Sequence, residues 1–223
     1  AQGVACSASK FGLRSTIVMP VTAPLAKIEA TKGYGAEVVL SGKCYDDAYA
    51  KACEICREEG AEFIHPYDDI DVIAGQGTIA LEILEEMPDC DVIIAPAGGG
   101  GLLSGIACAA KQIKPDIKVY GVQAENADAI AQSFQQKKKV TTDTASTIAD
   151  GIAVKNPGDI TVELINRYVD GVVTVSDNQI ADAILLLLER TKEIVESAGA
   201  SSVAAVINGK IDVKGKKVIC ILS

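Results

Sequence analysis

The 223-residue sequence has few aromatic residues and few basic ones. Aromatic side chains make up 4% of it, tryptophan is absent, and 21 Lys and Arg stand against 30 Asp and Glu, for a formal net charge of -9. Proteins that bind nucleic acid need basic side chains for the phosphates, and many use aromatic ones to stack on bases. The composition therefore predicts no nucleic-acid partner.

Long hydrophobic runs are also missing. The apolar stretch from Ile180 to Leu188 is interrupted by Asp182 and followed by Glu189, so it falls short of the roughly 20 apolar residues that span a bilayer. The first residues, Ala1 to Ala5, lack the basic flank of a signal peptide. We expect no membrane segment and a cytoplasmic protein.

No cysteine pattern of a disulfide framework or a zinc site is present. The seven cysteines are an odd number, mostly in apolar or helical surroundings, which is typical of reduced thiols. Cys53 and Cys56 have CxxC spacing, but they lie in the middle of a predicted helix with no second pair at zinc-site spacing. We interpret them as structural thiols and expect no disulfide.

Short β-branched runs alternate with helical stretches along the whole chain, which predicts an α/β fold of parallel sheets with helices on both faces. The turn from Pro66 to Asp69 is the best candidate for a crossing between domains. The predicted strands are Ser15–Met19, Ala36–Leu40, Glu62–His65, Val92–Ala95, Lys118–Gln123, Val172–Val175 and Lys217–Leu222. The predicted helices include Ala23–Tyr34, Asp46–Glu59, Gly77–Glu86, Leu102–Ile113, Thr161–Tyr168, Asn178–Glu196 and Ser201–Asn208.

Four consecutive glycines, Gly98 to Gly101, separate a buried strand from the start of a helix at Leu102. Glycines can take positive φ and turn several N–H groups toward one point, at the positive end of the helix dipole. This arrangement predicts an anion site that suits a phosphate monoester. Neither GxGxxG spacing nor a Walker lysine is present, which disfavours a nucleotide. The alternative is a tight strand-to-helix turn, for which one or two glycines would suffice.

Four segments in order carry a family resemblance. Together they resemble the threonine dehydratase and serine racemase group of pyridoxal 5′-phosphate (PLP) enzymes, which have the tryptophan synthase β-like fold. The resemblance covers the whole chain. The segments are Val-Ile-Ala-Gly-Gln-Gly-Thr at 72–78, Gly98 to Leu102, Ile-Ala-Asp-Gly-Ile-Ala-Val at 148–154 and Val-Glu-Ser-Ala-Gly-Ala at 195–200.

The resemblance implies two parallel sheets flanked by helices, in a fold truncated at its N-terminus. Residues 1–67 would form part of the family's small domain and residues 68–223 most of its large, PLP-binding domain. In the family the glycine loop holds the cofactor phosphate, which implies that Gly98, Gly99, Gly100, Gly101 and Leu102 do so here.

Four more residues are implied near the cofactor by the resemblance alone. Gly151 would lie along the ring, Ser223 would hydrogen-bond the pyridine nitrogen, Tyr67 would lie near the domain crossing, and Glu196 near the substrate. Three of them have a plainer interpretation as well. Ser223 can be an ordinary strand-end serine, Tyr67 a packing residue, and Glu196 a solvated carboxylate at a helix end.

The family's lysine that binds PLP covalently has no counterpart in this sequence. Neither Lys10, Lys27, Lys32 nor Lys43 lies in a matching context, so no catalytic residue is assigned. We expect the chain to be a fragment or processed portion, inactive by itself. Serine racemases carry acidic metal ligands where this chain has Gln123 and Ala129, and we therefore expect no metal site.

For the complete enzyme the resemblance implies PLP-dependent deamination of L-threonine, or L-serine, by β-elimination to a 2-oxo acid and ammonia. Two alternatives stay open: a serine racemase, and a catalytically inactive PLP-binding protein. The implied partner is a small amino-acid substrate. Homo-oligomers are usual in the family, so one is expected here.

Overall fold

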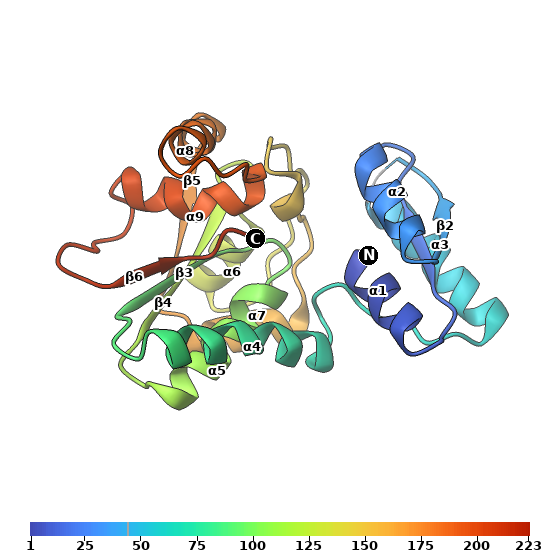
Figure 1. Ribbon diagram of the computed structural model, residues 1–223, viewed down its shortest axis with the longest axis horizontal. Helices are drawn as coiled ribbons and strands as arrows, with labels where there is room; N and C mark the ends of the chain where they lie inside the picture. Colours follow the sequence, from blue (N-terminus) through green and yellow to red (C-terminus); the bar gives the residue numbers. More distant parts are fainter. Residues whose placement is uncertain (44) are drawn as a thin grey trace. The chain divides into compact units, whose positions relative to one another are not determined.

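The computed structural model describes residues 1–43 and 45–223 (Figure 1). The chain divides into two compact units, Ala1–Pro66 and Tyr67–Ser223, and each is described by itself. Their assignment to the small and large domains of a PLP enzyme stays a prediction.

Among its described residues, the first unit consists of a two-stranded parallel sheet and three helices. Met19 at the end of β1 is buried, while the other strand residues are half-buried or exposed. Its core consists mainly of small residues, with Ile28 and Met19 as the larger buried side chains. The elements are α1 (Gln2–Lys10), β1 (Thr16–Met19), α2 (Leu25–Gly33), β2 (Glu37–Leu40) and α3 (Tyr45–Glu59), and β1 pairs with β2 from Thr16↔Glu37 to Met19↔Leu40.

The second unit contains a four-stranded sheet in the order β5-β4-β3-β6, with every pair of neighbours parallel. All five residues of β3 are buried, as expected for a central parallel strand covered on both faces. The strands are β3 (Val92–Pro96), β4 (Lys118–Ala124), β5 (Gly171–Val175) and β6 (Val218–Cys220).

Helices cover both faces of this sheet (Figure 1). Alternate residues of β3 belong to different cores, because successive side chains point to opposite faces: Ile93 to one and Ile94 to the other. Each fully buried Ile contributes about 1.5–3 kcal/mol. The first core includes α4 (Ile70–Glu86), α5 (Gly101–Ile113), α6 (Ala129–Gln136) and α7 (Asp159–Tyr168), and the second includes α8 (Asp177–Arg190), α9 (Ser197–Ile207) and the short helix η1 (Asp150–Ile152).

Three sequence predictions of elements are wrong. Glu62–His65 is not a strand; the rings of Phe63 and His65 pack edge-on against Tyr49, at centroid distances of 5.4 and 6.1 Å. The helix predicted from Gly77 begins seven residues earlier at Ile70. The helix predicted to reach Glu196 ends at Arg190, and a separate helix follows from Ser197.

The predicted α/β class with parallel sheets flanked by helices is confirmed. Within residues 1–43 and 45–223 no helix has both the length and the apolar character that crossing a membrane requires. Of the seven cysteines, Cys44 lies outside the described residues. The other six are free thiols, and Cys53 and Cys56 lie within α3 as expected.

Candidate functional site

The glycine loop joins the carboxyl end of β3 to the first turn of α5. Gly100 is the N-cap residue with φ of +102°, and its carbonyl oxygen accepts the Ser104 N–H at 2.9 Å. Among the described residues, the N–H groups from Gly98 to Leu102 have no hydrogen-bond acceptor. Five amides are therefore available at the positive end of the α5 dipole, which is the arrangement that binds a phosphate.

Protein atoms occupy the space that a Cβ would need at Gly99, Gly100 and Gly101, and at Gly98 that space is tight. A Cβ on Gly99 would lie 2.4 Å from Tyr67 Cγ, and one on Gly101 would lie 2.9 Å from Tyr67 Cα. A Cβ on Gly100 would lie 2.8 Å from Thr161 Cβ. Packing alone thus requires more than the one or two glycines of an ordinary turn. Tyr67 and Thr161 cover one side of the loop.

The ring of Tyr67 lies against Gly99 of the loop. Its hydroxyl donates a hydrogen bond to the Asn156 carbonyl oxygen at 2.9 Å, so the ring is held at both ends. The ring supports Gly99 directly, which agrees with the packing interpretation of Tyr67.

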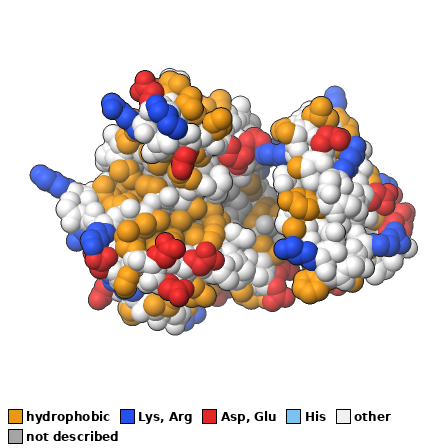
Figure 2. All heavy atoms as spheres, in the orientation of Figure 1, with side chains coloured by type: hydrophobic (Ala, Val, Ile, Leu, Met, Phe, Trp, Pro, Cys, Tyr) orange, Lys and Arg blue, Asp and Glu red, His pale blue; other side chains and the backbone are white. Residues whose placement is uncertain are grey.

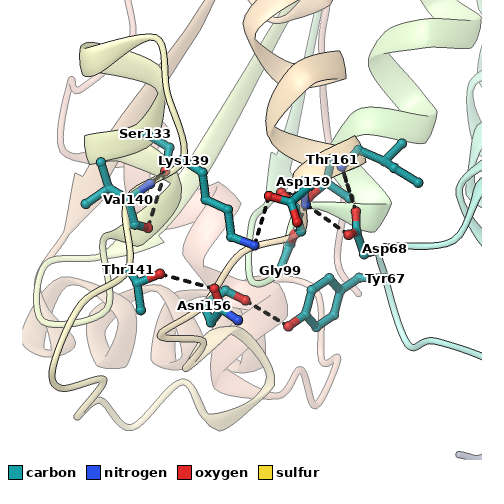
Figure 3. A network of polar contacts seen from close by, with 12 residues as sticks. Tyr67, Asp68, Gly99, Ser133, Lys139, Val140, Thr141, Asn156, Asp159 and Thr161 are labelled. Atoms are coloured by element: carbon teal, nitrogen blue, oxygen red, sulfur yellow. Dashed lines mark hydrogen bonds and ion pairs between the residues drawn. The ribbon is translucent and has the colours of Figure 1, made fainter.

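Asp68 and Thr161 belong to the same polar network, and the sequence did not single them out (Figure 3). Thr161 is fully buried, and its hydroxyl donates to the Gly99 carbonyl oxygen at 2.7 Å. The Asp68 carboxylate accepts three N–H groups in the first turn of α7, from Asp159, Ile160 and Thr161, at 2.9, 2.9 and 3.2 Å. The local sequence shows only two consecutive Asp residues, Asp68 and Asp69, before α4. Asp69 caps α4, whereas Asp68 caps the distant helix α7.

Gly151 lies beside the same loop, and Glu196 lies beside Gly151. A Cβ on Gly98 would be 3.2 Å from the Gly151 carbonyl oxygen, and one on Gly151 would be 3.2 Å from Glu196 Oε1. The structure therefore brings Gly98, Gly151 and Glu196 together from segments far apart in the sequence.

Ser223 lies next to α9, where a Cβ on Gly199 would be 2.5 Å from the Ser223 carbonyl oxygen. One open depression is lined by Glu193 to Glu196 together with Leu222 and Ser223. Glu196 and Ser223 thus share one depression. All the residues that the family resemblance placed near the cofactor lie in the second unit. Neighbouring pairs connect them, from Tyr67 and the loop through Gly151 and Glu196 to Ser223.

Gln123 is fully buried in β4. Its amide donates to the Ala97 carbonyl oxygen at 2.9 Å and accepts the Ala131 N–H at 2.8 Å. Both polar atoms of the side chain thus form hydrogen bonds within the protein. The described residues hold no group of three or more His, Cys, Asp or Glu side chains placed to bind a metal ion, and the absence of a metal site in the protein stays a prediction.

The geometry fits a phosphate ester. The unpaired amides of the loop and of the first turn of α5 supply hydrogen-bond donors for it. Gly151 lies beside the loop, and Glu196, next to Gly151, lines the depression that it shares with Ser223. The carboxyl edge of a parallel sheet is where α/β enzymes bind their ligands. The fold and the loop together are typical of phosphate-binding enzymes of the α/β class.

The chain belongs to the family described as pyridoxal-phosphate dependent enzyme, whose profile matches residues 1–223. The family's cofactor is the phosphate ester expected from the sequence.

An L-threonine ammonia-lyase of Thermotoga maritima is 52% identical over 223 residues, covering 100% of this chain and 55% of the relative. The processed form of threonine deaminase isoform 2 from Solanum lycopersicum has a TM-score of 0.92 at 35% identity, over 100% of this chain and 65% of that structure. Maize serine racemase also has a TM-score of 0.92, at 36% identity, over 98% and 68%. The chain spans little more than half the length of the Thermotoga relative.

Proposed function

We propose that the full-length protein is a PLP-dependent threonine ammonia-lyase, which deaminates L-threonine, and L-serine as a second substrate, to a 2-oxo acid and ammonia. The observation that carries the proposal is the set of five unpaired amides from Gly98 to Leu102, next to Gly151 and Glu196. The names of the similar proteins, an ammonia-lyase and a threonine deaminase, support the reaction.

When bound, PLP supplies the electron sink for breaking the bonds at the substrate's α and β carbons. The amides of Gly98, Gly99, Gly100, Gly101 and Leu102 bind its phosphate and fix its position. Because these donors belong to a rigid backbone, they cost little reorganisation when the anion binds.

Ser223 is proposed to hydrogen-bond the ring nitrogen, with Gly151 along the ring. A neutral hydroxyl does not favour a protonated pyridine as a carboxylate would. The resulting weaker electron sink favours elimination over a long-lived carbanion. Glu196, which shares a depression with Ser223, is proposed to lie near the substrate. Tyr67 is proposed to support the loop and to border the cofactor.

Residues 1–67 and 68–223 are proposed as parts of the small and large domains of that enzyme. We also propose that the protein is cytoplasmic and a homo-oligomer, with a small amino acid as its substrate. Six free cysteines suit a reducing compartment, and both charge and composition argue against nucleic acid.

The test is an assay of the full-length protein, with PLP, for 2-oxobutanoate formed from L-threonine. We expect PLP-dependent turnover, and the same assay without PLP is the control. Cofactor binding with no 2-oxo acid from either amino acid would instead support an inactive PLP-binding protein.

Serine racemisation is the second candidate, because maize serine racemase has the same TM-score as the threonine deaminase. Gln123 is neutral and buried, and it bonds the backbone of Ala97 and Ala131, which argues against the acidic metal site of such racemases. Chiral chromatography of the products from L-serine separates the two reactions. Pyruvate as the main product supports the lyase, and D-serine as the main product overturns it.

A further inference from the structure

The Gly99 carbonyl oxygen is held by two donors from the start of α7. The Thr161 hydroxyl donates to it at 2.7 Å, and the Gly158 N–H donates at 3.3 Å. The hydroxyl also lies 3.2 Å from the Gly158 carbonyl oxygen. Because a hydroxyl has one hydrogen, the shorter contact to Gly99 is its main bond.

Holding this oxygen fixes the direction of an amide in the loop. In a trans peptide the C=O and the following N–H point in opposite directions within one plane. The Gly99 oxygen points at α7, so the Gly100 N–H points away from α7. That N–H has no acceptor among the described residues, and it belongs to the group of amides at the start of α5.

We propose that Thr161 is a positioning residue for phosphate binding: its hydroxyl fixes the Gly99–Gly100 peptide so that the Gly100 N–H donates to the phosphate. The inference rests on the proposed PLP site and adds to it a residue outside the glycine loop. Thr161 does not touch the cofactor itself.

Thr161 is suited to this role because its own position is fixed by several contacts. It is fully buried in the first turn of α7, and its N–H donates to the Asp68 carboxylate at 3.2 Å. That carboxylate also caps the two preceding residues of the turn. Val162 and Ile165 of the same helix are part of the core under the sheet, so α7 cannot shift without disturbing that core.

Gly158 takes part through its lack of a side chain. A Cβ there would lie 2.2 Å from Asp68 Oδ1, so only glycine lets the carboxylate reach the helix start. Figure 3 shows Asp68 and Thr161 on the same side of this turn, with Gly99 beyond them. Removing the Thr161 hydroxyl leaves the Gly99 oxygen with the 3.3 Å bond alone, and the direction of the Gly99–Gly100 peptide is then held less firmly.

The experiment compares the full-length wild-type protein with Thr161→Val, which keeps the shape but loses the hydroxyl, and with Thr161→Ser, which keeps it. The probe is 4′-deoxypyridoxine 5′-phosphate, whose lack of an aldehyde makes its binding independent of a lysine. Its unphosphorylated form, 4′-deoxypyridoxine, reports on the ring alone. Dissociation constants come from calorimetry, and the ³¹P resonance of the bound probe reports on the phosphate surroundings.

We expect Thr161→Val to weaken binding of the phosphorylated probe about tenfold, as loss of a buried hydrogen bond does, and to shift the ³¹P resonance. Binding of the unphosphorylated form should not change, and Thr161→Ser should restore the wild-type behaviour. Ser133→Ala is the matched control, because it removes another buried hydroxyl of this unit that bonds the backbone of α6. It should bind the phosphorylated probe like the wild type.

Equal affinity of wild type and Thr161→Val for the phosphorylated probe overturns the proposal, as does an equal loss for both probes, which indicates general damage. If wild type does not bind the phosphorylated probe, the proposed PLP site itself fails. Should Thr161→Val not fold by circular dichroism, Thr161→Ala is compared with Thr161→Ser. These two differ only by the hydroxyl, and equal affinity for the phosphorylated probe would again contradict the role of Thr161.

Discussion

Gly100 is subject to two separate constraints. Its φ of +102° is one that residues with a Cβ rarely adopt, and Thr161 occupies the space where a Cβ would lie. Gly209, by contrast, has a φ of +64° and nothing within 4 Å of its Cβ position. The pair separates backbone strain from steric conflict at the loop.

At the scale of single residues we predict different outcomes for Gly100→Ala and Gly209→Ala. Gly209→Ala should lower the free energy of unfolding by about 1 kcal/mol through backbone strain and leave phosphate-ligand binding unchanged. Gly100→Ala should cost more and weaken that binding at least about tenfold, since the loop must move. Denaturant unfolding and calorimetry with 4′-deoxypyridoxine 5′-phosphate measure both effects. Equal ligand affinity in the two variants would contradict the assignment of the loop.

The glycine loop could be predicted from the sequence because its residues are contiguous and its chemistry is local. Thr161 and Asp68 could not, since their contacts with Gly99 and with the start of α7 span 62 and 91–93 residues. Nothing in a single sequence ties residues at such separations. The resemblance did point to Gly151 and Glu196, but only the fold shows that these two residues are neighbours.

At the scale of elements, Asp170 joins α5 and β4 just before β5. Its carboxylate forms ion pairs with Lys111 Nζ at 2.8 Å and Lys118 Nζ at 2.9 Å, and it accepts the Val119 N–H at 2.9 Å. Burial raises the pKa of Asp170, but the hydrogen bonds from the two lysines outweigh it and hold that pKa below its ordinary value of 3.8. The charged form is therefore the one that stabilises the fold.

We predict that Asp170→Asn lowers the free energy of unfolding by about 2 kcal/mol near neutral pH. Because the pKa is depressed in the folded state, this contribution is complete above the unfolded-state value near 4 and is lost as the pH falls below it. The difference from wild type should therefore shrink in acid. Thermal unfolding between pH 7 and pH 3 measures it, with Asp182→Asn on the exposed side of α8 as the control. A difference that grows in acid would show that the sign is wrong.

Helix boundaries were the least predictable feature at this scale. The sequence suggested a helix start at Gly77, but α4 begins at Ile70 and includes both Gly75 and Gly77. The reason is tertiary: a Cβ on Gly105 would lie 2.3 Å from the Ile73 carbonyl oxygen, and one on Gly77 would lie 3.1 Å from the Gly105 oxygen. Gly77 and Gly105 therefore allow α4 and α5 to pack closely against each other. In the same way, the end of α8 is followed by Lys192 at a φ of +64°, which residue type alone did not indicate.

At the scale of the whole molecule, the two units differ in how much core they contain. The second has two clusters of buried side chains, one on each face of a four-stranded sheet (Figure 1). Figure 2 shows hydrophobic side chains gathered on the visible face of this unit, bordered by acidic and basic ones. The first unit has two strands, and its buried residues are mainly small.

We predict that the two sheets open with different free energies in the 223-residue chain. Amides of β1 and β2 should exchange with solvent at least about tenfold faster than those of β3 and β4. Opening the smaller sheet exposes few buried apolar side chains to water, so it costs less free energy. Hydrogen–deuterium exchange followed by mass spectrometry measures this directly. Similar protection in both units would show that they unfold as one cooperative body.

The capping of α7 by Asp68 also bears on the order in which the protein can fold. Asp68 leaves the ribosome about 90 residues before the amides that it accepts, and the Gly99 oxygen likewise waits for Thr161. Closing such long loops is slow compared with forming a helix or a hairpin. The glycine loop can therefore be synthesised early and still reach its final shape late. A chain that can bind a phosphate there must already have brought together segments that were synthesised at different times.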